Sequence, residues 1–230
     1  GCKVFNRHHQ ILFGGDTIAY SSIWDLYNQV GYPGTQNRIF LPWPGDTTKY
    51  ILFYNKYNDL FTVSYLLYAI IQFDDVYPDG HVLFKDIELL QQDYNTVMSA
   101  VRHGNGRDWW VVLPLSNSNK FIKVLLDNSG PAIVDTQIIG NLWEPREGAG
   151  QSVFTPDGKK YIRFNAWKGL DIFDFDRCSG QLSSPIESEP LSNPVVVGGG
   201  VAVSANSRYL YLSNIYRLYQ FDLQEKDILA

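Results

Sequence analysis

The chain repeats a pattern of short strands and tight turns about every 49 residues, and this repeat limits the folds open to it. The turn residues Asp157 and Asn206 lie 49 positions apart, and Asn105 lies 52 positions before Asp157. Each turn follows a strand end and precedes a basic residue and an aromatic-rich strand. A looser copy occupies residues 42–53. Such self-similarity predicts units that bury their apolar faces against one another.

A second strand recurs in the same phase. Phe173 and Phe221 are 48 residues apart in matching apolar segments. The segments that contain this strand are residues 3–6, 120–126, 170–176 and 218–223. A unit of about 50 residues with four short strands is typical of a β-propeller blade. The sequence therefore predicts an all-β fold, a β-propeller of four-stranded antiparallel blades.

The repeat also predicts how the 230 residues divide. A partial blade occupies residues 1–16, and a last unit occupies residues 197–230. The fuller blades lie near residues 36–94, 95–142 and 147–196. This makes about four and a half blades, whereas propellers close with about four to eight. We expect the chain to be a fragment of a larger propeller. In the alternative, the two partial units combine into one closing blade of a small ring.

Composition agrees with this fold. Aromatic residues make up 15% of the chain and charged residues 19%, which excludes a disordered chain and disfavours a helical bundle. We expect the aromatic side chains to pack blade against blade. Turns at Asn105-Gly106 and Asp157-Gly158 supply the positive-φ residues that tight hairpins need. Helical signals are weak: residues 84–94 have a slight helical moment, and residues 23–27 suit one turn.

Several segments resemble large bacterial secreted or cell-surface β-propeller proteins with lactonase-like or WD-like repeats. Residues 99–110 resemble their "A-V-K-H-A-N-G-R-D-W-W" element, and residues 172–180 are similar to "F-D-F-D-R-C-T-G". Residues 3–11, 199–211 and 218–222 match further elements in the same order, whereas residues 65–77 fit poorly. The resemblance implies a secreted, extracellular or cell-surface protein. Many such proteins carry PKD-like modules or a type IX secretion sorting domain. No catalytic residue of the family maps onto this chain.

Charge, hydropathy and cysteine content limit the binding partners and the covalent links that the chain can have. The net charge is −5, and no basic run is present, so we expect no nucleic-acid partner. The longest apolar-leaning stretch, residues 65–73, is too short to span a bilayer. Cys2 and Cys178 are interpreted as two buried free thiols, with a disulfide between them as the alternative.

The four histidines show no arrangement that favours metal binding or catalysis. His8 and His9 are adjacent, so on a strand they would point to opposite faces, and we expect an exposed turn. His103 lies beside the Asn105 turn, and we expect it to hydrogen-bond a neighbouring turn. His81 is isolated, and no spacing resembles a zinc site. The sequence predicts no metal and no cofactor.

The other candidate residues have structural explanations. Asp171, Asp174 and Asp176 alternate with apolar residues and are expected on a solvated face. Residues 74–80 are expected to form an acidic turn, because they lack a complete calcium loop. Residues 198–200 are three glycines without a following Lys-Ser/Thr, and we expect close backbone passage there. Of Trp109 and Trp110, at least one is expected between blades.

Two functional hypotheses follow. The first is a non-catalytic extracellular or cell-surface scaffold for binding or adhesion, whose partner is a protein or glycan. The alternative is a propeller-type hydrolase, lactonase-like or glycosidase-like, with its active site at the channel mouth. His103, Arg102 and Arg146 are the residues that could converge there. The sequence favours the first hypothesis, names no catalytic residue, and leaves open whether another chain completes the ring.

Overall fold

The computed structural model describes residues 2–32, 34–60, 62–92, 97–143, 150–165, 167–190, 199–214 and 216–229. Within these residues the chain is almost entirely β-structure, with one helical turn, α1 (Trp24–Tyr27). The strands form four antiparallel sheets, each in simple up-and-down order. The predicted all-β fold of four-stranded antiparallel blades is confirmed.

We name the sheets blades 1 to 4 in chain order. Blade 1 comprises β1 (Arg38–Pro42), β2 (Lys49–Tyr57), β3 (Val63–Gln72) and β4 (His81–Gln91). Blade 2 comprises β5 (Ser99–Arg102), β6 (Trp109–Pro114), β7 (Ser118–Asp127) and β8 (Gly130–Trp143). Blade 3 comprises β9 (Gln151–Phe154), β10 (Lys160–Asn165), β11 (Gly169–Asp176) and β12 (Gln181–Glu187). Blade 4 comprises β13 (Gly200–Val203), β14 (Tyr209–Ser213) and β15 (Leu218–Asp222).

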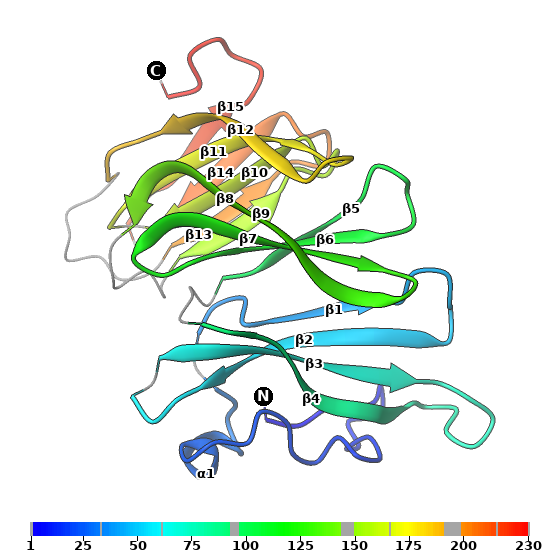
Figure 1. The fold of residues 1–230 in the computed structure, drawn as a ribbon. Coiled ribbons are helices and arrows are strands. Elements are labelled where there is room, and N and C mark those ends of the chain that lie inside the picture. The colour runs from blue at the N-terminus through cyan, green and yellow to red at the C-terminus, as the bar shows by residue number, and fades with distance from the viewer. Residues whose placement is uncertain are drawn as a thin grey trace.

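The blades stack face to face in chain order (Figure 1). The first strands β5, β9 and β13 lie next to one another from blade to blade, and so do the last strands β8 and β12. First strands therefore form the inner edge of the stack, and last strands form its outer edge. Residues 2–32 lie against blade 1, at the end opposite blade 4 (Figure 1). The two partial units thus lie apart, and the number of blades in a complete ring stays a prediction.

Aromatic residues form the core between blades, as expected. Between blades 2 and 3, Phe121, Tyr161 and Phe173 are all fully buried, and Phe121 makes edge contacts with the other two rings. Trp110 is 4% exposed in the same cluster, which confirms that one of the two tryptophans lies between blades. Gly199 also behaves as predicted, because a Cβ there would overlap the Phe164 ring. Gly198 lies outside the described residues.

Tight turns join the first two strands of each blade. Gly106 and Gly158 have φ values of 75° and 72°, as the Asn-Gly and Asp-Gly turns predict. The equivalent residue of blade 4 is Ser207, with φ 59°. The same backbone bond closes each turn: Trp43 N to Lys49 O, His103 N to Asp108 O, Thr155 N to Lys160 O and Ser204 N to Tyr209 O. These four bonds align the blades residue by residue.

Three sequence expectations need correction. Residues 84–94 are not helical in their described part, because β4 runs through Gln91; pairing with β3 overrides a weak helical moment. Asp171 is 1% exposed rather than solvated, since it shares a face of β11 with Phe173 and not with Asp174. Cys178 is exposed, whereas Cys2 is buried, and both are free thiols. The single turn at residues 23–27 is confirmed as α1.

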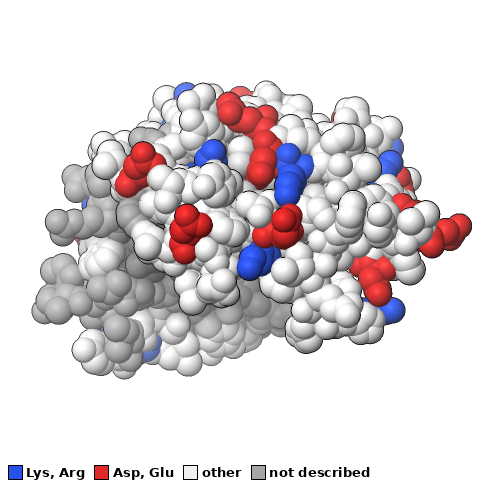
Figure 2. All heavy atoms as spheres, turned by 90° about the horizontal axis from the view of Figure 1, so that it is seen from below, with Lys and Arg blue, Asp and Glu red and all other residues white. Residues whose placement is uncertain are grey.

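Membrane-spanning helices and surface charge bear on two of the predictions about partners. None of the described helical segments has the length and apolar character that crossing a bilayer requires. Figure 2 shows the N-terminal end of the stack, where acidic and basic side chains are scattered singly or in small groups among uncharged ones. A phosphate backbone is attracted by a basic stripe, and this face has none.

Candidate functional site

The inner edge of the stack carries a groove of about 610 Å³, which we call the inner-wall groove. Its walls are the first strands of blades 1 to 3 and the turns that follow them. This volume falls in the range of small-molecule sites. The lining residues are Gln36, Arg38, Ile39, Leu41, Met98, Ser99, Ala100, Val101, Arg102, Trp109, Ser152, Val153, Phe154, Thr155, Pro156 and Arg177.

Side-chain hydrogen bonds fix the strands that form this groove. The Gln36 Nε2 donates to Ser152 O at 2.7 Å, and its Oε1 accepts from Ser152 N at 2.7 Å. The Ser99 and Ser152 hydroxyls lie 2.6 Å apart, and the Ser99 hydroxyl donates to Ser152 O. These bonds join three blades near the start of β1, β5 and β9. They satisfy backbone groups that neighbouring sheets cannot pair directly, and so hold the groove in one shape.

Arg102 and Arg177 line the groove, Arg38 lies where it borders the second groove described below, and no Asp, Glu or His lines it among the described residues. Arg102 stacks on Trp109 with its guanidinium carbon 3.8 Å from the ring centroid, and its Nη1 donates to Arg107 O. Arg38 donates from Nη1 to Asn37 Oδ1, but its buried Nε has no hydrogen-bond partner within the described part of the chain. Burial lowers the pKa of Arg38. The groove therefore carries positive charge without internal neutralisation.

Most other arginines of the described residues have carboxylate partners. Arg107 pairs with Asp108, Arg163 with Asp171 and Arg208 with Asp222, each at 2.7 or 2.8 Å. Arg38, Arg102 and Arg177 form no ion pair within the described ranges. Guanidinium groups without an internal partner are suited to hold an anion from outside, because they offer planar, charged donors.

Of the residues proposed for the channel mouth, Arg102 and His103 do not converge. Arg102 packs on Trp109, whereas the His103 ring reaches the opposite way, with Nε2 3.1 Å from Cys178 O. The His103 Nδ1 accepts from Asn105 N within its own turn, and the bond of Nε2 to Cys178 O confirms the expected hydrogen bond to a neighbouring turn. Arg146 lies outside the described residues.

The remaining candidates also have structural roles. His8 and His9 are exposed in a turn, as predicted, and His9 has φ 61°. Asp79 and Gly80 end a turn closed by Gly80 N to Tyr77 O. The described residues contain no cluster of His, Cys, Asp or Glu side chains suited to a metal ion.

Sequence reasoning missed Arg38 and Arg177. The four turn bonds place Arg38 at the same position as Met98, Gly150 and Gly199 in the other blades. A charged residue where the other repeats carry uncharged ones was the available signal, and aligning the first strands would have found it. Arg177 gave no such signal, because it lies in a turn between β11 and β12 whose approach to the groove depends on how blades 2 and 3 pack.

Comparison with solved structures places the chain among β-propellers. A "putative exo-beta-1,3-galactanase" from Bifidobacterium bifidum matches with a TM-score of 0.50 and 10% identity, over 82% of this chain and 70% of that protein. A "functionally unknown protein" from Desulfotomaculum acetoxidans matches with a TM-score of 0.49 and 17% identity, over 84% of this chain and 57% of that one.

A third match is a "putative 6-phosphogluconolactonase" from Bacteroides uniformis, with a TM-score of 0.47 and 14% identity, over 82% of this chain and 68% of that one. This chain therefore spans between 57% and 70% of the three matched lengths. No protein-family model matches the sequence, and no curated protein matches it. At these identities the likeness concerns the fold alone.

Proposed function

We propose that this chain is part of a ligand-binding β-propeller whose inner-wall groove takes an anionic, sugar-sized molecule. The observation that carries the proposal is a pair of arginines, Arg102 and Arg177, that line one groove and form no ion pair within the described part of the chain. An anion such as a carboxylate or phosphate would neutralise them. Trp109 supplies an aromatic surface beside Arg102, which suits a sugar ring or another flat apolar face.

The hydrolase hypothesis stays beside this proposal. Two of the three reported neighbours are named as a galactanase and a lactonase, and none is named as an adhesion protein, so the names lie nearer to hydrolysis than to a non-catalytic scaffold. General acid–base catalysis needs a titratable group within reach of the substrate. The described lining residues of the groove include arginines but no Asp, Glu or His. Arginines bind and orient an anion. The secreted location likewise stays a proposal, based on the family resemblance.

Titration calorimetry tests the proposal. The protein is titrated with sugar acids and sugar phosphates, and the uncharged parent sugars serve as controls. We expect the charged ligands alone to bind, and binding to weaken as salt rises. Arg102→Gln and Arg177→Gln should each weaken binding at least about tenfold, because a charge-assisted hydrogen bond contributes roughly 1.5–3 kcal/mol. The matched control is Arg217→Gln, which removes an exposed guanidinium outside the groove and should bind as the parent does.

Equal binding of charged and uncharged sugars would contradict the proposal, and so would equal losses in Arg102→Gln and Arg217→Gln. The same samples are assayed for hydrolysis of sugar lactones and β-1,3-linked galactosides. Turnover that Arg102→Gln removes would establish the hydrolase alternative at this groove.

A further inference from the structure

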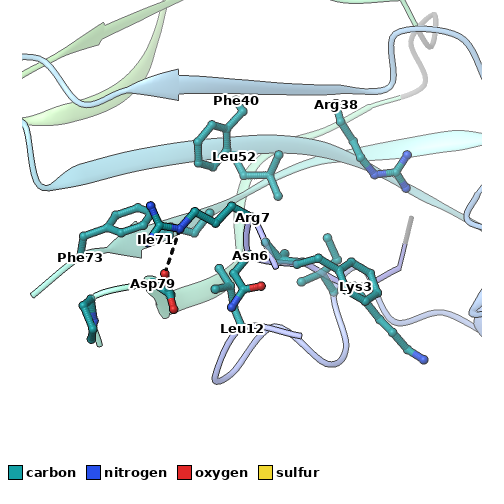
Figure 3. Close-up of a pocket in the computed structure, with 14 residues that line it drawn as sticks. Lys3, Asn6, Arg7, Leu12, Arg38, Phe40, Leu52, Ile71, Phe73 and Asp79 are labelled. Atoms are coloured by element: carbon teal, nitrogen blue, oxygen red, sulfur yellow. Dashed lines mark ion pairs between the residues drawn. The ribbon is translucent and has the colours of Figure 1, made fainter. Parts of the chain in front are cut away.

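A second groove lies at the end of the stack, between the N-terminal segment and the outer face of blade 1 (Figure 3). It has a volume of about 600 Å³. Phe40, Leu52 and Ile71 form its floor on blade 1, and Phe5 and Leu12 border it from the N-terminal segment. Arg7 and Asp79 pair across its rim at 3.4 Å. We call this the end groove.

The N-terminal segment next to the groove is itself half of a blade. Phe5 and Ile11 form an antiparallel bridge, and Leu12 N donates to Val4 O. Phe13 then bridges His81 of β4, so this hairpin lies beside the outer strand of blade 1. It occupies the position that the last two strands of one blade take beside the next blade.

The turn of this hairpin shows which strands of a complete blade the hairpin corresponds to. Asn6 Oδ1 accepts from His8 N, as Asp127 Oδ1 accepts from Ser129 N and Asp176 Oδ1 accepts from Cys178 N. Residue 6 thus corresponds to residues 127 and 176, which end the third strands of blades 2 and 3. The hairpin therefore represents third and fourth strands. The amide and carbonyl of Phe5, on the side away from Ile11, form no hydrogen bond among the described residues.

The other blades show what covers the equivalent surface. The aligned first-strand residues are Phe40, Ala100, Ser152 and Val201. Ser152 is fully buried and Val201 is 4% exposed, but Phe40 is 50% exposed. Ser152 is covered by Ser99 of β5, and Val201 packs in one cluster with Ile162 and Phe164 of β10. In each case the cover is the first strand pair of the preceding blade.

We propose that the end groove is the docking site of a two-stranded antiparallel β-hairpin with an apolar face. One strand of the hairpin pairs with the free backbone edge at Phe5, which is strand addition to an exposed edge. Its apolar side chains cover Phe40 and Leu52, as β5–β6 and β9–β10 cover blades 3 and 4. The N-terminal hairpin already fills the outer half of the blade position, so two further strands complete it.

An extended variant tests the proposal. Because residue 6 corresponds to residue 127, Gly1 corresponds to residue 122. A second copy of residues 97–121 is therefore placed directly before Gly1, which adds the inner hairpin of blade 2 in phase. We expect hydrogen exchange of the Phe5 amide to slow at least about tenfold, because a ladder bond protects it. We also expect the thermal midpoint to rise by several degrees.

The matched control carries the same extension with aspartate in the copy at the positions of Val101 and Val112, whose side chains face the next blade. It should leave exchange at Phe5 as in the parent chain. Equal protection in both extended variants, or none in either, would overturn the proposal.

A second measurement needs no extension. In a Cys178→Ser background, Phe40→Cys is modified with a maleimide while a peptide of residues 97–114 is added. Slowing of the reaction by at least threefold supports docking. An unchanged rate, or equal slowing by a small apolar amphiphile such as a fatty acid, contradicts a site built for a β-hairpin.

Discussion

The interface between blades 2 and 3 buries its aromatic side chains, whereas the free face of blade 1, which borders the end groove, leaves an aromatic side chain half exposed. Between the blades, Phe121, Tyr161 and Phe173 are fully buried. On the face of blade 1 that borders the end groove, Phe40 is 50% exposed, although its ring stacks on Tyr50 with the centroids 5.1 Å apart. The aromatic side chains of a blade are thus buried where a neighbouring blade covers them, as expected when each repeat cannot bury its own face.

The largest expected effect comes from removing a ring at the closed interface. Phe121→Ala deletes the ring that contacts both Tyr161 and Phe173, at centroid distances of 5.8 and 5.4 Å. Because the rigid sheets cannot collapse around the cavity, we expect a loss of ~3–5 kcal/mol in the free energy of unfolding. Urea denaturation measures it. Phe121→Leu is the control, with a smaller loss, and equal losses in both variants would contradict a cavity effect.

The same interface contains a buried ion pair, whose disruption should have the next largest effect. Arg163 Nε donates to Asp171 Oδ2 at 2.7 Å, and the guanidinium lies 3.9 Å from the Trp143 ring centroid. Both side chains are almost fully buried. Arg163→Met leaves the carboxylate without its partner, and we expect a loss of about 3 kcal/mol near pH 7.

This loss should depend on pH in a specific direction. Burial already raises the pKa of Asp171, and removing the guanidinium, which lowers it, raises it further. The unfolded chain then releases the proton at lower pH than the folded chain, so Arg163→Met loses stability as pH rises above about 4. Urea denaturation at pH 4 and pH 7 measures this slope. Arg163→Met with Asp171→Leu lacks the titrating group, and an equally steep slope in that control would contradict the assignment.

These residues also show how much of the fold and of the inner-wall groove could be predicted from the sequence. The repeat predicted the all-β propeller fold and an interblade position for at least one of Trp109 and Trp110, because both follow from local pattern and spacing. It placed Asp171 with Asp174 and Asp176, although strand parity puts it on the other face. It missed Arg38 and Arg177, because a groove formed by three blades depends on packing between distant segments. The disposition of the N-terminal hairpin depends on pairing with β4, which no local signal indicates.

A smaller effect is expected at the polar turn between β5 and β6 of blade 2, which contacts blade 3 where Gly104 N donates to Arg177 O. Asp108 is 5% exposed and accepts from Arg107 Nε and from Asn105 Nδ2 at 2.8 and 2.6 Å. Its hydrogen bond with Arg107 lowers its pKa. Asp108→Asn should cost ~1–2 kcal/mol near pH 7, by loss of charge-assisted bonds. The lowered pKa contributes stability above about pH 4 that is lost as pH falls through the folded value, so the difference should shrink towards pH 2.

Urea denaturation at pH 7 and pH 2 checks the Asp108 prediction. Asp176→Asn is a useful comparison, because that exposed carboxylate accepts bonds within its own turn and should cost less. A difference from the parent that grows as pH falls would contradict the stated role of Asp108.

The smallest effect is expected on the free face of blade 1. Its size distinguishes this face most clearly from the closed interface between blades 2 and 3. Phe40→Ala removes a half-exposed ring from a surface that no blade covers, so little packing is lost, and we expect a change of at most ~1 kcal/mol. In the extended variant described above, the added hairpin covers Phe40, and the same substitution should then cost more, approaching the loss in Phe121→Ala. Urea denaturation of the four combinations measures this coupling. If Phe40→Ala costs the same with and without the extension, the free face differs from the closed interface for a reason other than the missing cover.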